Sequence, residues 1–114
     1  MEMIVHLHKE IFDIVRDGLK DVEVRVNDDK RRKLHVGDTL IFVNRGCEND
    51  KIKTKVNNLV YFKNFTDVVE YYKMEKIYLK ETTKDEYLKL MSKFYSNKDV
   101  EEYGVVAIEF CKES

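Results

Sequence analysis

Residues 18–26 read Gly-Leu-Lys-Asp-Val-Glu-Val-Arg-Val. The glycine is typical of the left-handed residue that ends a helix, and the alternation of apolar and polar residues after it predicts a β-strand. Because successive side chains point to opposite faces of a strand, the valines lie on one face and Glu23 and Arg25 on the other. Lys20 stands where this strand begins. The stretch therefore gathers an amine, a carboxylate and a guanidinium within six residues.

A second stretch, residues 36–42, reads Val-Gly-Asp-Thr-Leu-Ile-Phe and predicts a turn that leads into an apolar strand. That strand is expected at residues 39–44, and a final strand, almost continuously apolar, at residues 104–111. Continuous apolar runs are typical of strands that are buried on both faces. We therefore expect both strands to be well buried, with the final strand central in the sheet.

Periodicity and capping residues locate the remaining elements. About three helices are predicted, at residues 8–17, at residues 64–72 after the cap Asn64, and behind the capping box of Thr83 and Glu86. Further strands are expected at residues 3–7, 51–56 and 59–62, with a bulge at residues 57–58. Residues 77–79 are interpreted as a brief extended piece and residues 96–102 as a polar break.

Five or six strands and about three helices, in an order that does not alternate strictly, predict an α+β fold. The sheet is expected to be mixed or mostly antiparallel, and strongly curved or closed into a small barrel. Strands near both ends of the chain predict that the termini help to close it. With 114 residues, the chain is expected to form a single domain over residues 1–114.

Composition narrows the class of protein. A formal net charge of −1 gives no general attraction to nucleic acid, so an anion must be bound by a local cluster. No apolar run is long enough to cross a bilayer and no signal peptide is visible, so we expect a cytoplasmic protein without a membrane partner. Cys47 and Cys111 do not have the spacing of a metal site, and a disulfide between them is left as an alternative. The three histidines have no carboxylate or cysteine at a spacing that completes a metal site. Neither a metal nor a cofactor is predicted.

The order of these motifs resembles the ASCH domain. The similarity is carried by the strand with Lys20, Glu23 and Arg25 after a glycine, a basic loop, the glycine–aspartate turn, and the closing Tyr-Gly-Val-Val-Ala-Ile-Glu-Phe of residues 103–110. ASCH domains are similar to PUA domains, so the resemblance implies a PUA-like small β-barrel with helices at its ends. It also implies a cleft at the barrel mouth, lined by these three polar residues, beside a groove suited to RNA or nucleotides.

Some members similar to this family are small amidohydrolases that remove an acyl group from modified cytidine. The resemblance implies that Lys20 is the catalytic lysine of such an enzyme, followed by a threonine three residues later and a glutamate in the C-terminal half. This sequence has Glu23 at the second position, and Glu81 and Glu86 both lie near the third. Glu81 is the candidate acid. Other members are similar to ribonucleases, but no matching triad is found in this sequence.

Each candidate residue also has a purely structural interpretation. Lys20 is otherwise an exposed lysine at the start of a strand, and Glu23 with Arg25 is otherwise a surface ion pair that contributes about 0–1 kcal/mol. A carboxylate beside a lysine holds it protonated, so the residues themselves favour an ammonium that binds an anion or a carbonyl oxygen. The dense basic run contains Arg31, Arg32 and Lys33. It is either a phosphate-contacting loop or a solvated loop balanced by the acidic residues before it.

The leading prediction is a binding module that holds RNA or a nucleotide between the Lys20, Glu23 and Arg25 strand and the basic loop. The alternative is a small amidohydrolase that acts on acylated, N4-acetylcytidine-like nucleosides with Lys20 as catalytic residue. A protein-interaction module is a third class. Tyr61, Tyr71 and Tyr78 are the candidates for exposed rings on which a base stacks.

One prediction concerns the two faces of the first motif strand. Val24 is expected to be buried, because it lies at the centre of the apolar face. Its expected neighbours are Ile41 or Val43 and Val106 or Ile108. Glu23, on the polar face, is expected to contribute little to stability and much to ligand binding.

Overall fold

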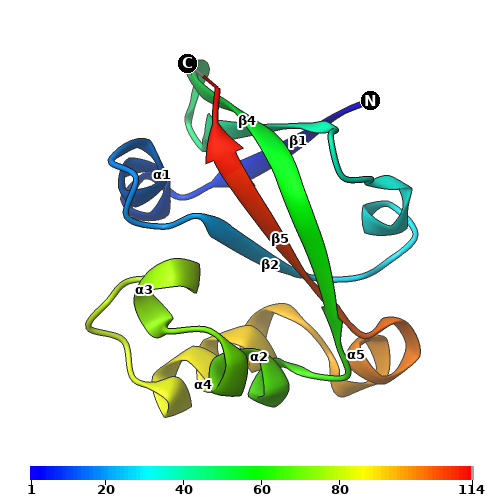
Figure 1. Cartoon of the computed structure of the whole chain (residues 1–114). Helices are drawn as coiled ribbons and strands as arrows, with labels where there is room; N and C mark the ends of the chain where they lie inside the picture. Colours follow the sequence, from blue (N-terminus) through cyan, green and yellow to red (C-terminus); the bar gives the residue numbers. More distant parts are fainter. Residues whose placement is uncertain (114) are drawn as a thin grey trace.

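The protein is built on a single five-stranded sheet that curls on itself (Figure 1). The structure is a computed structural model and describes residues 1–113. Within that range the strand order is β1-β3-β4-β5-β2, and only the β1–β3 pair is parallel. The strands are β1 (Glu2–Leu7), β2 (Val22–Val26), β3 (Thr39–Asn44), β4 (Cys47–Phe62) and β5 (Val105–Lys112). The mixed sheet and the interior position of β5 confirm the predicted α+β class.

The long strand β4 joins the two halves of the curled sheet. Its first part lies antiparallel to β3 and its second part antiparallel to β5. The register shifts between Val56 and Asn58, which confirms the predicted bulge, and a bulge bends and twists its strand. β1 and β2 remain the two edges of a half-barrel. No strand pair among residues 1–113 joins these edges, so the prediction that the chain ends close a barrel is wrong.

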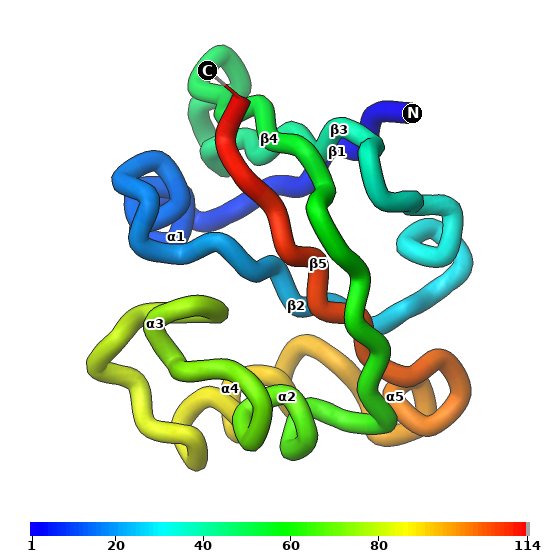
Figure 2. Tube along the Cα trace, viewed as in Figure 1, coloured from blue at the N-terminus to red at the C-terminus, as the bar shows by residue number. Residues whose placement is uncertain are grey.

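Helices flank the half-barrel on two sides (Figures 1 and 2). α1 packs near β3, whereas α2 to α5 gather together and contact β2, β4 and one another. The helices are α1 (Lys9–Arg16), α2 (Phe65–Tyr71), α3 (Met74–Ile77), α4 (Lys84–Phe94) and α5 (Asn97–Tyr103), with a 3₁₀ turn η1 (Arg31–Lys33). Five α-helices within residues 1–113 therefore correct the expected number of about three.

The two additional helices are α3 and α5, and each lacks the apolar pattern that reveals a helix in sequence. α3 has four residues, which is too short for periodicity; it ends at Ile77, the first residue of the extended piece expected at residues 77–79, and residues 78–79 form no strand. α5 lies in the expected polar break; it is capped by Ser96 but contains no buried residue. The caps predicted from sequence are confirmed, because Asn64 opens α2 and Thr83 forms a capping box at α4.

The core is divided into two hydrophobic clusters. One contains β1, α1, β3 and the side chains of β5 that face them, including Val106 and Ile108. The other lies between β2, β5 and the helices α2 to α4, and includes Val105 and Ala107. Neighbouring residues of β5 thus face different clusters, as the alternation of side chains in a strand requires. This strand is buried on both faces because helices cover both.

Val24 is 8% exposed, which confirms its predicted burial. It lies directly opposite Ala107 in the β2–β5 pair, and residues opposite each other share one face of a sheet. Val24 therefore packs in the cluster with α2 and α4. Its predicted packing against the other face was wrong, since the residues expected there lie outside this cluster: Ile41, Val43, Val106 and Ile108.

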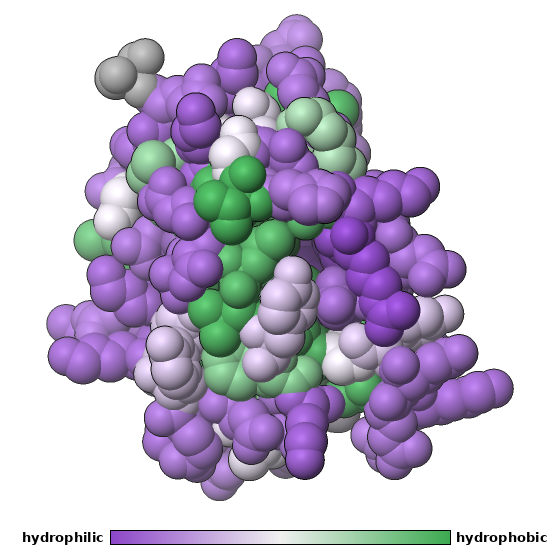
Figure 3. Space-filling model, turned by 45° about the vertical axis from the view of Figure 1, so that its right-hand side comes forward, coloured by the Kyte–Doolittle hydropathy of each residue, from purple (hydrophilic) through white to green (hydrophobic). Residues whose placement is uncertain are grey.

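The surface alternates between polar and apolar regions. Figure 3 shows one face on which a strip of apolar residues is bordered by hydrophilic ones.

Cys47 and Cys111 are both free and exposed. None of the helices within residues 1–113 has the length and apolar character needed to pass through a membrane.

Candidate functional site

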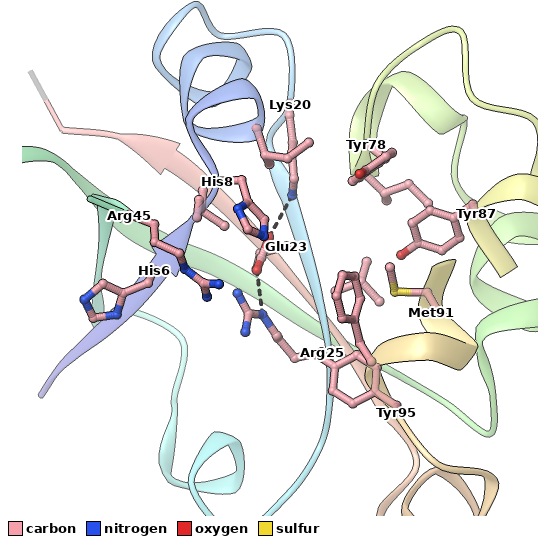
Figure 4. Close-up of a pocket in the computed structure, with 15 residues that line it drawn as sticks. His6, His8, Lys20, Glu23, Arg25, Arg45, Tyr78, Tyr87, Met91 and Tyr95 are labelled. Atoms are coloured by element: carbon pink, nitrogen blue, oxygen red, sulfur yellow. Dashed lines mark hydrogen bonds and ion pairs between the residues drawn. The ribbon is translucent and has the colours of Figure 1, made fainter. Parts of the chain in front are cut away.

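A cavity of about 340 Å³ lies at the open side of the half-barrel (Figure 4). Both edge strands line it: β1 contributes His6 and Leu7, and β2 contributes Glu23, Val24 and Arg25. Side chains of α3 and α4 form the opposite wall. Small-molecule sites typically have volumes of about 300–1,000 Å³, so this cavity is at the small end of that range. The cavity exists because the sheet does not close.

The two walls of the cavity differ in chemistry (Figure 4). The polar wall carries basic and acidic groups from the edge strands and their neighbouring turns: His6, His8, Lys20, Glu23, Arg25 and Arg45. The apolar wall carries rings and a thioether from α4 and the turns beside it: Tyr78, Tyr87, Met91, Phe94 and Tyr95. A ligand that fills the cavity therefore meets charge on one side and aromatic surface on the other.

Glu23 holds two cations at the polar wall. Its Oε1 accepts a hydrogen bond from Lys20 Nζ at 2.9 Å, and its Oε2 accepts one from Arg25 Nε at 2.6 Å. Lys20 Nζ also donates to the carbonyl oxygen of Val22. Lys20 is 2% exposed and Glu23 is 5% exposed. The three residues are therefore a buried charge cluster, which excludes both the exposed lysine and the surface ion pair considered from sequence.

Local structure brings the charge cluster together. Gly18 ends α1 with a φ of 78°, a left-handed conformation that glycine adopts readily. The backbone N–H groups of Leu19 and Lys20 then donate to the carbonyl oxygen of Ile14, at 2.9 and 3.2 Å. This turn sets Lys20 just before β2, and the pleat of the strand places Glu23 and Arg25 on the same face. The side chains that the sequence places within six residues are therefore in direct contact in the structure, through Glu23.

Burial and charge act against each other in this cluster. Burial raises the pKa of Glu23, but the charges of Lys20 and Arg25 outweigh it and lower that pKa to about 2. Burial lowers the pKa of Lys20 below its usual value, and the Glu23 carboxylate opposes this shift. Burial also acts to lower the pKa of Arg25, but Glu23 outweighs it, so the net shift is upward. At neutral pH the cluster thus contains an ionised carboxylate and a charged guanidinium.

The aromatic wall is electrically neutral. Burial raises the pKa of Tyr78, Tyr87 and Tyr95 above that of a free tyrosine. Each hydroxyl therefore remains protonated at neutral pH and acts as a hydrogen-bond donor. Tyr78 and Tyr87 meet edge-on, with ring centroids 5.8 Å apart. These rings supply flat apolar surface with polar tips at the cavity.

The other residues predicted for the site lie outside the cavity lining. Arg31 places a guanidinium nitrogen 3.7 Å from the sulfur of Met3. Arg32 donates to the carbonyl oxygens of Asn27 and Tyr103 at 2.9 and 3.4 Å, and Lys33 is exposed. Arg32 and Lys33 thus lie at the protein surface, whereas Arg31 is half-buried and close enough to Arg25 for that charge to lower the Arg31 pKa.

The two candidate glutamates are also placed away from the cavity lining. Glu81 is exposed in the turn between α3 and α4. The carboxylate of Glu86 accepts the backbone N–H of Thr83 at 2.9 Å and completes the capping box. The structure therefore brings together Lys20, Glu23 and Arg25 but does not add either of these glutamates to them.

Several residues that line the cavity were not predicted from the sequence. Arg45 lies in the turn between β3 and β4, and its composition indicated only a turn. Tyr87 and Phe94 were expected on the buried side of a helix, but Phe94 is 59% exposed and both line the cavity. Tyr95 follows α4 directly and carried no pattern. The exposed histidines His6 and His8 were considered only as metal ligands. Among residues 1–113, no group of three or more metal-binding side chains is assembled.

The family model of the ASCH domain matches residues 5–114. The chain belongs to the ASCH domain family. The match spans almost the whole chain, which confirms the resemblance carried by the residues of β2, the basic loop and the last strand. No curated protein sequence matches this chain.

Two solved structures are similar to this ASCH domain over nearly their full length. A crystal structure of the hypothetical protein PH0355 has 29% sequence identity and a TM-score of 0.84, and the match covers 99% of this chain and 100% of that one. A solution NMR structure of protein PF0455 from Pyrococcus furiosus has 26% identity and a TM-score of 0.79, with coverage of 98% and 97%. These TM-scores show that both structures share the fold of this chain.

Proposed function

We propose that this ASCH domain binds RNA or a nucleotide, with one nucleotide held in the cavity between the two edge strands. The observation that carries the proposal is the contrast between the cavity walls, with cations on one side and aromatic rings on the other. Proteins recognise unstacked nucleotides by stacking bases on aromatic rings and by pairing phosphates with basic side chains. The family assignment supports the same class of ligand.

The charge cluster has separate roles within this proposal. Both oxygens of Glu23 accept hydrogen bonds from Lys20 and Arg25, and the Glu23 side chain is only 6% exposed, so Glu23 is assigned a positioning role. Arg25 keeps its two terminal nitrogens, because only its Nε donates to Glu23. Its side chain is 23% exposed, which leaves it accessible from the cavity. Arg25 therefore contacts the ligand, and Glu23 orients the Arg25 side chain.

The proposal is tested by calorimetric titration at low salt with short single-stranded RNAs and with the four ribonucleoside monophosphates. Arg25→Ala and Tyr78→Ala are expected to weaken binding about tenfold or more, since each removes a group from one wall. Arg16→Ala and Tyr61→Ala are the matched controls, because both side chains are exposed and neither lines the cavity.

Three outcomes decide the proposal. Loss of affinity in the two cavity variants, with wild-type affinity in both controls, supports it. Equal affinity in all four variants places the binding elsewhere on the molecule. Absence of binding by the wild type across all probes excludes it. Thermal denaturation of each variant shows whether its fold is retained, and Tyr78→Ala keeps the test decisive if Arg25→Ala unfolds.

A second candidate function is amide hydrolysis of acylated nucleosides. It is favoured by the Lys20 amine, which is buried in the cavity and has a pKa lowered by that burial. An uncharged amine is a nucleophile or base, so a lowered pKa is what catalysis by lysine requires. The hydrogen bond with Glu23 opposes this, because it stabilises the ammonium. Turnover of N4-acylated cytidine that is lost in Lys20→Arg would establish this function, and turnover unchanged in that variant would remove Lys20 from it.

A further inference from the structure

Arg45 stands at the polar wall without an acidic partner among residues 1–113. The turn between β3 and β4 is tied to the end of β1, because the Arg45 backbone N–H donates to the carbonyl oxygen of Leu7 at 2.8 Å. This places Arg45 beside His6 and His8 at the cavity (Figure 4). The Arg45 side chain is exposed and forms no ion pair within residues 1–113. No carboxylate of the described residues therefore lies within ion-pair distance of its guanidinium.

Arg45 and Arg25 direct their guanidinium groups toward each other beside Glu23 (Figure 4). The terminal nitrogens of Arg25 form no ion pair within the described residues, because Glu23 accepts only from its Nε. Arg31 adds a third cation, and burial and the charge of Arg25 lower its pKa. Cations that gather in this way repel one another unless an anion lies between them. Guanidinium forks match the oxygens of a phosphate, so phosphate is the anion that this geometry suits.

The charge of the lining indicates which kind of phosphate is bound. Lys20 Nζ donates to both Glu23 and the carbonyl oxygen of Val22, as an ammonium does, so the lining counts three cationic side chains, Lys20, Arg25 and Arg45, against one carboxylate, Glu23. With the histidines neutral, two positive charges are in excess. A phosphate monoester carries a charge of about −1.5 to −2 at neutral pH, whereas each internal phosphodiester of a nucleic acid carries a single negative charge. The monoester is the better match.

Resting on the proposed function, we infer that Arg25 and Arg45 form a phosphate subsite that prefers a terminal phosphate monoester over an internal phosphodiester. The ligand class is then a nucleoside monophosphate or the phosphorylated end of an RNA chain. Its base lies against Tyr78 and Tyr95, and its phosphate lies between the two guanidinium groups. The cavity volume of about 340 Å³ agrees with one nucleotide rather than a longer segment.

Calorimetric titration with a matched series of probes tests this inference. The series contains the four ribonucleosides, their 5′- and 3′-monophosphates, and dinucleoside monophosphates as phosphodiesters. The best monophosphate is expected to bind about tenfold or more tightly than its nucleoside, and more tightly than the phosphodiester. Arg45→Ala is expected to remove this advantage, weakening the binding of monophosphates much more than the binding of nucleosides. Arg45→Lys keeps the charge without the fork and is expected to retain part of the advantage.

Arg16→Ala is the control, because Arg16 is an exposed arginine of α1 outside the cavity lining. The inference is overturned if nucleosides and their monophosphates bind equally well, although the proposed function would then stand. It is also overturned if Arg45→Ala weakens both by the same factor, since Arg45 would then not act through the phosphate. If no probe binds, the proposed function and the phosphate subsite fail together.

Discussion

The charge cluster of Lys20, Glu23 and Arg25 and the basic turn η1 lie close together in the sequence, but they differ in environment. The cluster surrounds one buried carboxylate, and the hydrogen bonds of Glu23 set the direction of both cations. In η1 the Arg32 side chain is exposed and bonded to backbone carbonyl oxygens, and its guanidinium lies 5.4 Å from the Tyr103 ring. The comparison shows that density of charge alone does not identify a site. A buried counter-charge that orients cations toward a cavity is the more informative feature.

The largest effect is expected from removal of the carboxylate at the centre of the charge cluster. Glu23→Ala should lower the free energy of unfolding at pH 7 by about 3–5 kcal/mol, because it leaves the buried Lys20 and the half-buried Arg25 without their counter-charge. This reverses the expectation from sequence that Glu23 contributes little to stability. Denaturant titration measures the loss, with Glu81→Ala as the control on an exposed glutamate. A loss below about 1 kcal/mol would make the cluster equivalent to a surface ion pair.

The same carboxylate makes stability depend on pH. The pKa of Glu23 is about 2 in the folded protein, against a usual value of 4.5. A carboxyl with a depressed folded pKa stabilises the protein above the unfolded pKa, and this contribution is lost as pH falls through the folded pKa. The difference in unfolding free energy between the wild type and Glu23→Gln should therefore be complete above about pH 5 and shrink toward pH 2. A difference that stays constant over this range would show that Glu23 does not titrate there.

Val24→Ala compares the contribution of packing with that of charge within a single strand. Val24 neighbours Glu23 on β2 but packs in the hydrophobic cluster with α2 and α4. Loss of two methyl groups there should cost about 1–3 kcal/mol, from lost burial and the remaining void. The loss should be smaller than that of Glu23→Ala in the same denaturant titration. The reverse order would mean that packing, and not the charge cluster, dominates the stability of β2.

The smallest effect is expected in the basic turn. Arg32→Ala should change the free energy of unfolding by less than about 1 kcal/mol, since exposed charged side chains contribute little. It should also leave the affinity for nucleoside monophosphates unchanged, because Arg32 does not line the cavity. Denaturant and calorimetric titrations measure the two quantities. A clear loss of RNA affinity in this variant, without loss of nucleotide affinity, would instead extend the binding surface from the cavity to η1.

The sequence predicted most of the elements and half of the polar wall. Asn64 and Thr83 were recognisable as caps because capping depends on residues three positions apart. Lys20, Glu23 and Arg25 were recognisable as a group because strand alternation and a glycine turn act over a few residues. The helix α5 was not predicted, since it has no buried residue and so no apolar period. Arg45 was not predicted as a site residue, because the composition of its turn does not show that the turn lies beside the end of β1.

Local sequence patterns were enough to predict the α+β class, the strand that carries the charge cluster and the family. These depend on patterns in which the interacting residues are near each other in the chain. Three features became visible only in the tertiary structure. The sheet stays open, and its two edges β1 and β2 border one cavity. Rings of α4 face the cations of β2 and Arg45 across that cavity. These relations depend on strand order, on the bulge in β4 and on helix packing. Each joins residues that are distant in sequence, and local periodicity carries no information about such contacts.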